Sequence, residues 1–285
     1  MQKKLVLSVL IASLLTACGG SSDNSNSNPQ VTPQATANSQ QAQRLTTFTL
    51  HDVGDFWDTI KTQGYATHNL SVGNKTLVSS ARGQTTIQLD LTAVPEGFSA
   101  PLPARVNYAG GSRAAHNADV TLRSYRGFYA GAFIYDKEDF DNALDYDYQV
   151  YGKPTQANEL PTRGNATYTG RAFNIHPADD RAFTYRIDFA NKRGSGSVAA
   201  QGAHPGLILK EAALAYEDSP FGAAFAVSWD DGKVAAADNS IIGQYELFVA
   251  GPGAEEVTGA LSYTPAANAS ETDLIFYGKR GDITP

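Results

Sequence analysis

Alternation of apolar and polar residues dominates the sequence from about residue 120 onward and restricts this part of the chain to β structure. One stretch has its apolar residues at every second position: Phe183, Tyr185, Ile187 and Phe189. The stretches 146–150 and 165–170 alternate in the same way. Successive residues of a strand point to opposite faces of a sheet, so this pattern predicts strands with one buried face. The one short helical candidate in the folded part is Val53 to Lys61.

Turn-forming residues separate these stretches, as at 161–164, 230–232 and 251–253. Short strands joined by tight turns favour an antiparallel barrel or sandwich, and roughly eight strand-like runs lie between residues 122 and 279. Eight strands close into a barrel that is filled by its own side chains or holds one small ligand. The small and polar run 109–118 suggests a domain boundary. We therefore expect an all-β fold with a handle domain at 45–118 and a barrel at 119–285.

The first residues have the pattern of an export signal. Lys3 and Lys4 precede an apolar run from Leu5 to Leu15, which is too short to span a membrane as a helix. The run ends in LTACG, which resembles a bacterial lipobox and contains the single cysteine of the chain, Cys18. This pattern predicts a signal peptide at 1–17 and lipidation of Cys18, which would tie the protein to a membrane through acyl chains. The alternative is an ordinary secretory signal with a chance cysteine.

Residues 18–44 are expected to form a disordered tether. Between Gly19 and Arg44 the only large apolar residue is Val31, so this segment cannot bury enough surface to offset chain entropy. The net charge of −7 and the pI of about 5.2 exclude the basic footprint of a nucleic-acid-binding protein. A single cysteine also excludes an internal disulfide.

Three segments of the second half carry more specific motifs. They are LPTRGNATYTGRA at 160–172, IDFANKRGSGSV at 187–198 and GQYELFVAGPGAEEVTGALSY at 243–263. Together with IFYGKR at 275–280, they resemble the barrel domain of transferrin-binding protein B and related surface lipoproteins. Their glycines, among them Gly170, Gly243 and Gly259, are typical of bulges or tight curvature in a closing barrel.

This resemblance implies a C-terminal eight-stranded antiparallel β-barrel preceded by a smaller β-rich handle or clamp domain. It also implies a lipoprotein on the outer-membrane surface, exported by a surface lipoprotein assembly modulator (Slam) protein. The short single-barrel proteins that the chain resembles are the hemophilin-type haem-binding proteins and the Nil-type nematode-colonisation lipoprotein; factor H-binding protein is a more distant relative. Gly19, where an Asp would favour retention in the inner membrane, agrees by resemblance with outer-membrane delivery.

Catalytic motifs are not evident in the sequence. It contains no G-x-S-x-G, H-E-x-x-H, Walker or G-x-G-x-x-G pattern. The neighbouring carboxylates Asp145 and Asp147, like Glu255 and Glu256, could serve as acid–base pairs, but such pairs are more typical of a solvated strand face or turn. We therefore expect a protein that is not an enzyme.

Five histidines lack the spacing of a zinc site, so we expect no structural metal: His51, His68, His116, His176 and His204. Haem needs one or two imidazoles in a pocket lined by aromatic rings. His51, His68 and His116 are the candidate haem ligands, because a clamp that closes on a barrel would offer ligands from the first half of the chain. For each of them taken singly, a surface or hydrogen-bonded histidine is the more common role.

Aromatic residues supply candidates for a binding patch. Trp57 and Tyr65 lie near the candidate ligands, and Tyr125 and Tyr129 belong to a cluster with Phe128, Phe133 and Tyr135 that we expect to be mostly barrel core. The leading hypothesis is a surface protein that captures haem, or a host protein carrying haem or iron. A colonisation factor that binds host protein or glycan without haem would instead present an exposed aromatic patch. A surface hydrolase would bring a carboxylate pair or a nucleophile and base together in a cleft.

Overall fold

The computed structural model describes residues 44–51, 64–138, 144–217, 223–265 and 269–285. Within these ranges the chain is built from antiparallel strands, and the only helical elements are the two 3-10 turns η1 (Leu91–Ala93) and η2 (Pro177–Asp179). No helix in this part of the chain is long and apolar enough to cross a membrane. The predicted signal peptide, Cys18, most of the predicted tether and the helical candidate 53–61 lie outside the described residues.

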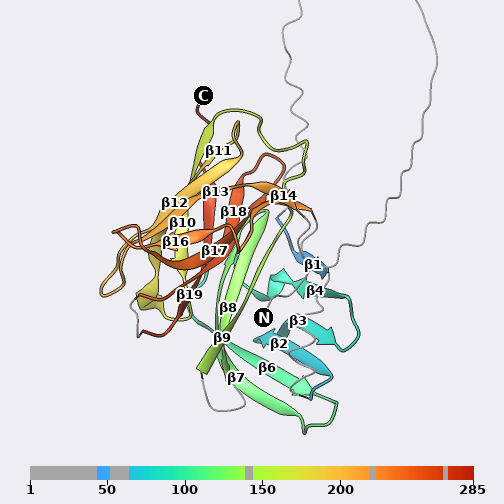
Figure 1. Cartoon of the computed structure of the whole chain (residues 1–285). Helices are drawn as coiled ribbons and strands as arrows, with labels where there is room; N and C mark the ends of the chain where they lie inside the picture. The colour runs from blue at the N-terminus through green and yellow to red at the C-terminus, as the bar shows by residue number, and fades with distance from the viewer. Residues whose placement is uncertain (1–43, 52–63, 139–143, 218–222, 266–268) are drawn as a thin grey trace, which may run out of the picture. The chain divides into compact units, whose positions relative to one another are not determined.

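The first nine strands form one sheet, the handle (Figure 1). They are β1 (Thr47–His51), β2 (Thr67–Val72), β3 (Lys75–Ala81), β4 (Thr86–Asp90), β5 (Gly97–Phe98), β6 (Leu102–Ala109), β7 (His116–Arg126), β8 (Ala130–Glu138) and β9 (Leu144–Gly152). Their order is β1-β4-β3-β2-β6-β7-β8-β9, and β5 pairs with β7. The two end strands approach each other, because the ring of Phe48 on β1 lies 6.2 Å from that of Tyr151 on β9. The handle is thus a sheet curled almost into a barrel.

The second sheet closes on itself. Its strands are β10 (Asn165–Phe173), β11 (Arg181–Asp188), β12 (Arg193–Val198), β13 (Leu207–Ala213), β14 (Ala215–Glu217), β15 (Ala224–Val227), β16 (Lys233–Ala235), β17 (Ile241–Ala250), β18 (Glu256–Tyr263) and β19 (Thr272–Arg280). Pairing of β17 with both β16 and β18 closes a ring of eight: β10, β11, β12, β13, β16, β17, β18 and β19. The expected eight-stranded antiparallel barrel after a β-rich handle is confirmed.

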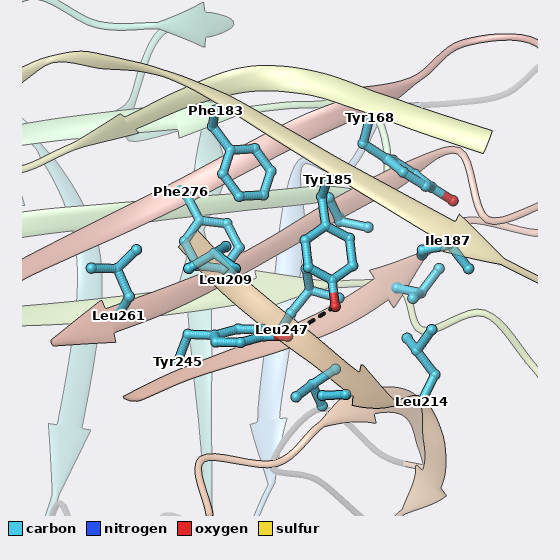
Figure 2. Close-up of a cluster of buried hydrophobic side chains, with 14 of the residues drawn as sticks. Tyr168, Phe183, Tyr185, Ile187, Leu209, Leu214, Tyr245, Leu247, Leu261 and Phe276 are labelled. Carbon is cyan, nitrogen blue, oxygen red and sulfur yellow. Dashed lines mark hydrogen bonds between the residues drawn. The ribbon is translucent and has the colours of Figure 1, made fainter. Parts of the chain in front are cut away.

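Aromatic side chains fill the interior of the barrel (Figure 2). Along β11, buried and exposed residues alternate as the sequence predicted, so that Phe183 and Tyr185 point inward. The ring of Phe183 stacks on Phe276 at 4.5 Å, and the hydroxyls of Tyr185 and Tyr245 lie 3.1 Å apart. The barrel is therefore packed with its own side chains.

Close approach of strands explains two of the glycines in the sequence motifs. A Cβ at Gly170 would lie 1.9 Å from the carbonyl oxygen of Tyr277, and one at Gly259 would lie 2.0 Å from that of Glu246. These are distances between neighbouring strands of the barrel wall, which no other residue type tolerates without local rearrangement. The motifs therefore encode the closure of the barrel.

The change of sheet lies later in the chain than the division expected after residue 118. That position falls inside β7, which pairs with β6 on one side and β8 on the other. By strand pairing the handle extends to Gly152, and the closed barrel begins at Asn165. Phe133 and Tyr135, expected in the barrel core, consequently lie in the core of the handle.

Candidate functional site

The inward face of the handle encloses a cavity of about 60 Å³. Apolar side chains from five strands make most of its wall: Leu50, Leu70, Val78, Ile87, Leu89 and Phe133. His68, Tyr135, Tyr148 and Gln149 add polar atoms. His68 lies on β2, whereas Tyr135 and Tyr148 lie on β8 and β9, so the imidazole and the phenol rings come from different parts of the curled sheet. His68, one of the predicted site residues, thus lines this cavity.

Three of the predicted residues gather around Tyr108, which the sequence did not single out. His68 on β2 lies opposite Tyr108 on β6, and Tyr108 lies opposite His116 on β7. Directly opposed residues of antiparallel strands point to the same face. The ring centroids are accordingly 5.0 Å apart for His68 and Tyr108, and 6.4 Å apart for Tyr108 and His116. Tyr65 packs on the same tyrosine at 5.3 Å. The order of the three strands would have revealed Tyr108, but that order cannot be read from one sequence.

This arrangement limits how haem could be held. Because Tyr108 stands between His68 and His116, the two imidazoles cannot bind opposite faces of one haem iron without a rearrangement of these strands. His68 alone lines the cavity and is 2% exposed. The cavity is also far smaller than the roughly 300 Å³ at which small-molecule pockets begin. Haem could therefore be held there only after a rearrangement of the handle that enlarged the cavity.

The remaining candidates in the handle are only partly defined. His51 ends β1 and pairs with Thr86, but its side chain is not among those described. Trp57 lies outside the described residues. Tyr65 is 3% exposed, so it belongs to the handle core and does not form part of an exposed patch.

Tyr125 and Tyr129 lie where the handle meets the barrel. Tyr125 is 3% exposed and stacks on Tyr277 of β19, with ring centroids 3.4 Å apart and planes inclined by 3°. Burial raises the pKa of Tyr125, and the nearby charge of Glu256 raises it further. Tyr129 is half-buried in the β7–β8 turn, and burial raises its pKa as well. Tyr125 therefore joins the two domains and does not face a partner.

Glu256 at the start of β18 holds the β7–β8 turn of the handle. It is 4% exposed, and its two carboxylate oxygens accept backbone N–H groups from Phe128, Tyr129 and Ala130 at 3.1, 3.0 and 2.8 Å. Bonds to a charged acceptor are the stronger kind of hydrogen bond, and here all three are removed from water. The expectation of a solvated carboxylate is wrong for Glu256, because the handle covers this end of the barrel strand.

An ion pair makes a second connection between the domains. Arg123 on β7 is 1% exposed and donates two hydrogen bonds to the carboxylate of Asp180, at 2.6 and 2.8 Å. The same guanidinium donates to the carbonyl of Asn174 and lies 4.7 Å from the ring centroid of Phe98. With both ends hydrogen-bonded, this pair fixes the handle on the barrel and leaves neither charge uncompensated.

Groups of titratable side chains suited to metal binding are a further possibility for a site. Among the residues with described positions, no three or more His, Cys, Asp or Glu side chains are grouped as a metal site would require. The large apolar side chains that are exposed belong to separate elements: Phe128, Tyr216, Ile241 and Ile283. The fold thus defines a handle-and-barrel protein whose handle contains a small, mostly apolar cavity.

Comparison with known families identifies part of the barrel. Residues 158–261 match the family model described as Factor H binding protein, C-terminal. The match starts just before β10 and ends within β18, so it covers somewhat more than a third of the chain and none of the handle. No curated protein sequence matches the chain significantly.

Solved structures of transferrin-binding protein B share a low similarity with the chain. A Tyr-167-Ala and Trp-176-Ala double mutant from Haemophilus parasuis Hp5 is 13% identical, with a TM-score of 0.45 over 76% of this chain and 45% of the other. Intact Ap-TbpB, with its N and C lobes, is 14% identical, with a TM-score of 0.43 over 77% and 46%. The isotype 1 protein from serogroup B Neisseria meningitidis is 14% identical, with a TM-score of 0.40 over 76% and 44%. The matched region thus covers less than half of each of these proteins.

Proposed function

We propose that this chain is a non-enzymatic lipoprotein of the bacterial outer-membrane surface that captures a host protein. The match of residues 158–261 to a family model named for factor H binding is the observation that carries the proposal. The packing of the barrel supports it, because a barrel filled by its own aromatic side chains offers only its outer surface and loops to a partner. A macromolecule suits such a surface better than a small ligand does.

Lipidation of Cys18 and a tether over 18–44 belong to the same proposal. A flexible segment of this length would have a root-mean-square span of about 30 Å, so the folded part could stand clear of the membrane. A Slam-type export protein would carry it to the cell exterior.

Metabolic labelling tests the lipid anchor. Labelled palmitate should be incorporated into the native chain and not into Cys18→Ala; equal labelling of both would refute the lipidation of Cys18.

Binding to purified host proteins on a sensor surface tests the function directly. Factor H, transferrin and haemoglobin are the first probes, because the family match and the sequence resemblance point to them. Saturable binding of one of them to the immobilised protein is the expected result. Failure of all three, and of intact host cells, to bind bacteria displaying the protein would refute the proposal.

Haem is the second candidate cargo, favoured by the position of His68. Its buried imidazole lines an apolar cavity together with three aromatic rings, and a single imidazole in such surroundings is one known way to hold haem iron. Titration with haemin should then give a sharp Soret band that His68→Ala abolishes. His176→Ala, on an exposed histidine before η2, is the matched control and should leave the band unchanged. No band with the native protein refutes haem binding and leaves host-protein capture in place.

A further inference from the structure

A pocket of about 450 Å³ lies where β10 and β11 of the barrel meet the turn η2. Arg171 on β10 lies directly opposite Ala182 on β11, and both residues are exposed. This volume falls within the range of roughly 300–1,000 Å³ that is typical of small-ligand pockets, unlike the cavity beside His68. The wall of the pocket includes Arg171, Pro177, Asp180, Arg181, Ala182 and Gln201.

Arg171 has no carboxylate of its own in this pocket. Its guanidinium lies 3.7 Å from the carboxylate of Asp180, but that carboxylate already accepts two hydrogen bonds from Arg123, at 2.6 and 2.8 Å. The side chain of Arg171 is 53% exposed, and its guanidinium lies 5.0 Å from the ring centroid of Phe98. One carboxylate thus serves two guanidinium groups, and Arg171 presents a positive charge that a ligand can reach.

Arg181 adds a buried positive charge to the wall. It is 1% exposed and donates to the carbonyl of Pro205 and the hydroxyl of Tyr263, neither of which carries a charge. The neighbouring carboxylate of Asp179 is paired with His204, at 2.8 Å. With the histidine neutral, three arginines and two aspartates lie in and beside the pocket, an excess of one positive charge in a chain whose net charge is −7. Because a buried charge is screened less than an exposed one, this excess favours an anion in the pocket.

We propose that this pocket binds a small acidic sugar, with the carboxylate of the sugar on Arg171. A guanidinium binds a carboxylate through two parallel hydrogen bonds. The amide of Gln201 donates one N–H to the carbonyl of Ala178, so its oxygen and its second N–H can bond to sugar hydroxyls. Asp180 can accept from a hydroxyl but repels a second acidic group, which favours a ligand with one carboxylate and several hydroxyls over a polyanion. This site goes beyond the proposed capture of a host protein and does not depend on it.

Calorimetric titration with matched ligands tests the proposal. The probes are the methyl glycosides of N-acetylneuraminic acid and of glucuronic acid, together with their methyl esters, which keep the hydroxyls but lose the charge. N-acetylglutamic acid amide, a carboxylate without hydroxyls, represents an acidic protein side chain. Arg171→Gln removes the exposed guanidinium of the pocket, and Arg186→Gln, at an exposed position further along β11, is the matched control. Circular dichroism verifies that each variant is folded.

The native protein and Arg186→Gln should bind at least one of the acidic sugars, and should bind its methyl ester at least tenfold more weakly. Arg171→Gln should bind the same acid about tenfold more weakly or worse. No binding of either acid, equal binding of acid and ester, equal affinity of the two variants, or tighter binding of the glutamate derivative would each refute the inference. Failure of the sugars leaves the capture of a host protein in place, and failure of the host proteins on the sensor surface leaves the pocket in place.

Discussion

Replacing Glu256 by Gln tests the connection between barrel and handle. Its carboxylate accepts three backbone N–H groups, one at Oε1 and two at Oε2. Glutamine has only one acceptor oxygen. If that oxygen accepts the N–H groups of Tyr129 and Ala130, the amide nitrogen of the glutamine faces the N–H of Phe128. One buried donor is then left without an acceptor, at a cost of about 1–3 kcal/mol, and the other two bonds lose their charge assistance.

Together these losses should lower the free energy of unfolding by about 2–4 kcal/mol. For a folded part of this size, that corresponds to a fall in Tm of roughly 5–15 °C. Thermal and urea unfolding followed by near-UV circular dichroism would measure both quantities. The matched control is Glu217→Gln on the exposed end of β14, which should change stability by less than about 0.5 kcal/mol. A loss at Glu256→Gln as small as that of the control would show that the carboxylate does not hold the handle.

Three further changes should give measurable effects. Tyr185→Phe removes the hydroxyl that lies 3.1 Å from Tyr245 and should destabilise the barrel by about 1 kcal/mol in urea unfolding. Burial raises the pKa of Tyr245 from 10.0 to about 12, so the contribution of its neutral form to the free energy of unfolding is complete below pH 10 and is lost as the pH rises toward 12. Tyr245→Phe should therefore reduce the fall in the free energy of unfolding over this pH range. An unchanged dependence of that free energy on pH would contradict the reasoning. Gly170→Ala should cost about 1–3 kcal/mol or more, because its Cβ would meet a carbonyl at 1.9 Å, whereas Gly206→Ala, with its nearest neighbour at 3.5 Å, should be tolerated.

The barrel could be predicted from the sequence because its strands have two different faces. Along β11, buried and exposed positions alternate from Arg181 to Ile187, since one face packs in the barrel and the other meets water. Apolar residues therefore recur at every second position of the sequence, which is the pattern that predicts such a strand. The glycine motifs added the closure, since Gly170 and Gly259 mark places where neighbouring strands leave no room for a Cβ.

The division between the domains could not be found in this way. In β7, residues from Leu122 to Arg126 are all buried, because one face packs in the handle and the other on the barrel. Such a strand has no alternation, and the small polar run before it gave the stronger but misleading signal. The handle therefore continues 34 residues beyond the expected end at residue 118, to Gly152.

The surroundings of the candidate site residues could not be predicted, for a related reason. Residue type singled out His68 and Tyr65 as candidates, but their common neighbour Tyr108 depends on the pairing of β2 with β6, in which His68 and Tyr108 are 40 residues apart in the chain. The burial of Glu256 depends on a turn more than a hundred residues earlier. Contacts of this range leave no local pattern in a single sequence.

Buried charged groups fix how the handle and the barrel are joined. At the junction, buried charged groups have hydrogen-bonded partners: Glu256 accepts three backbone N–H groups, and Arg123 donates to the carboxylate of Asp180, so removal of these partners would cost several kcal/mol. Such groups fix the orientation of the handle and cannot at the same time meet a ligand.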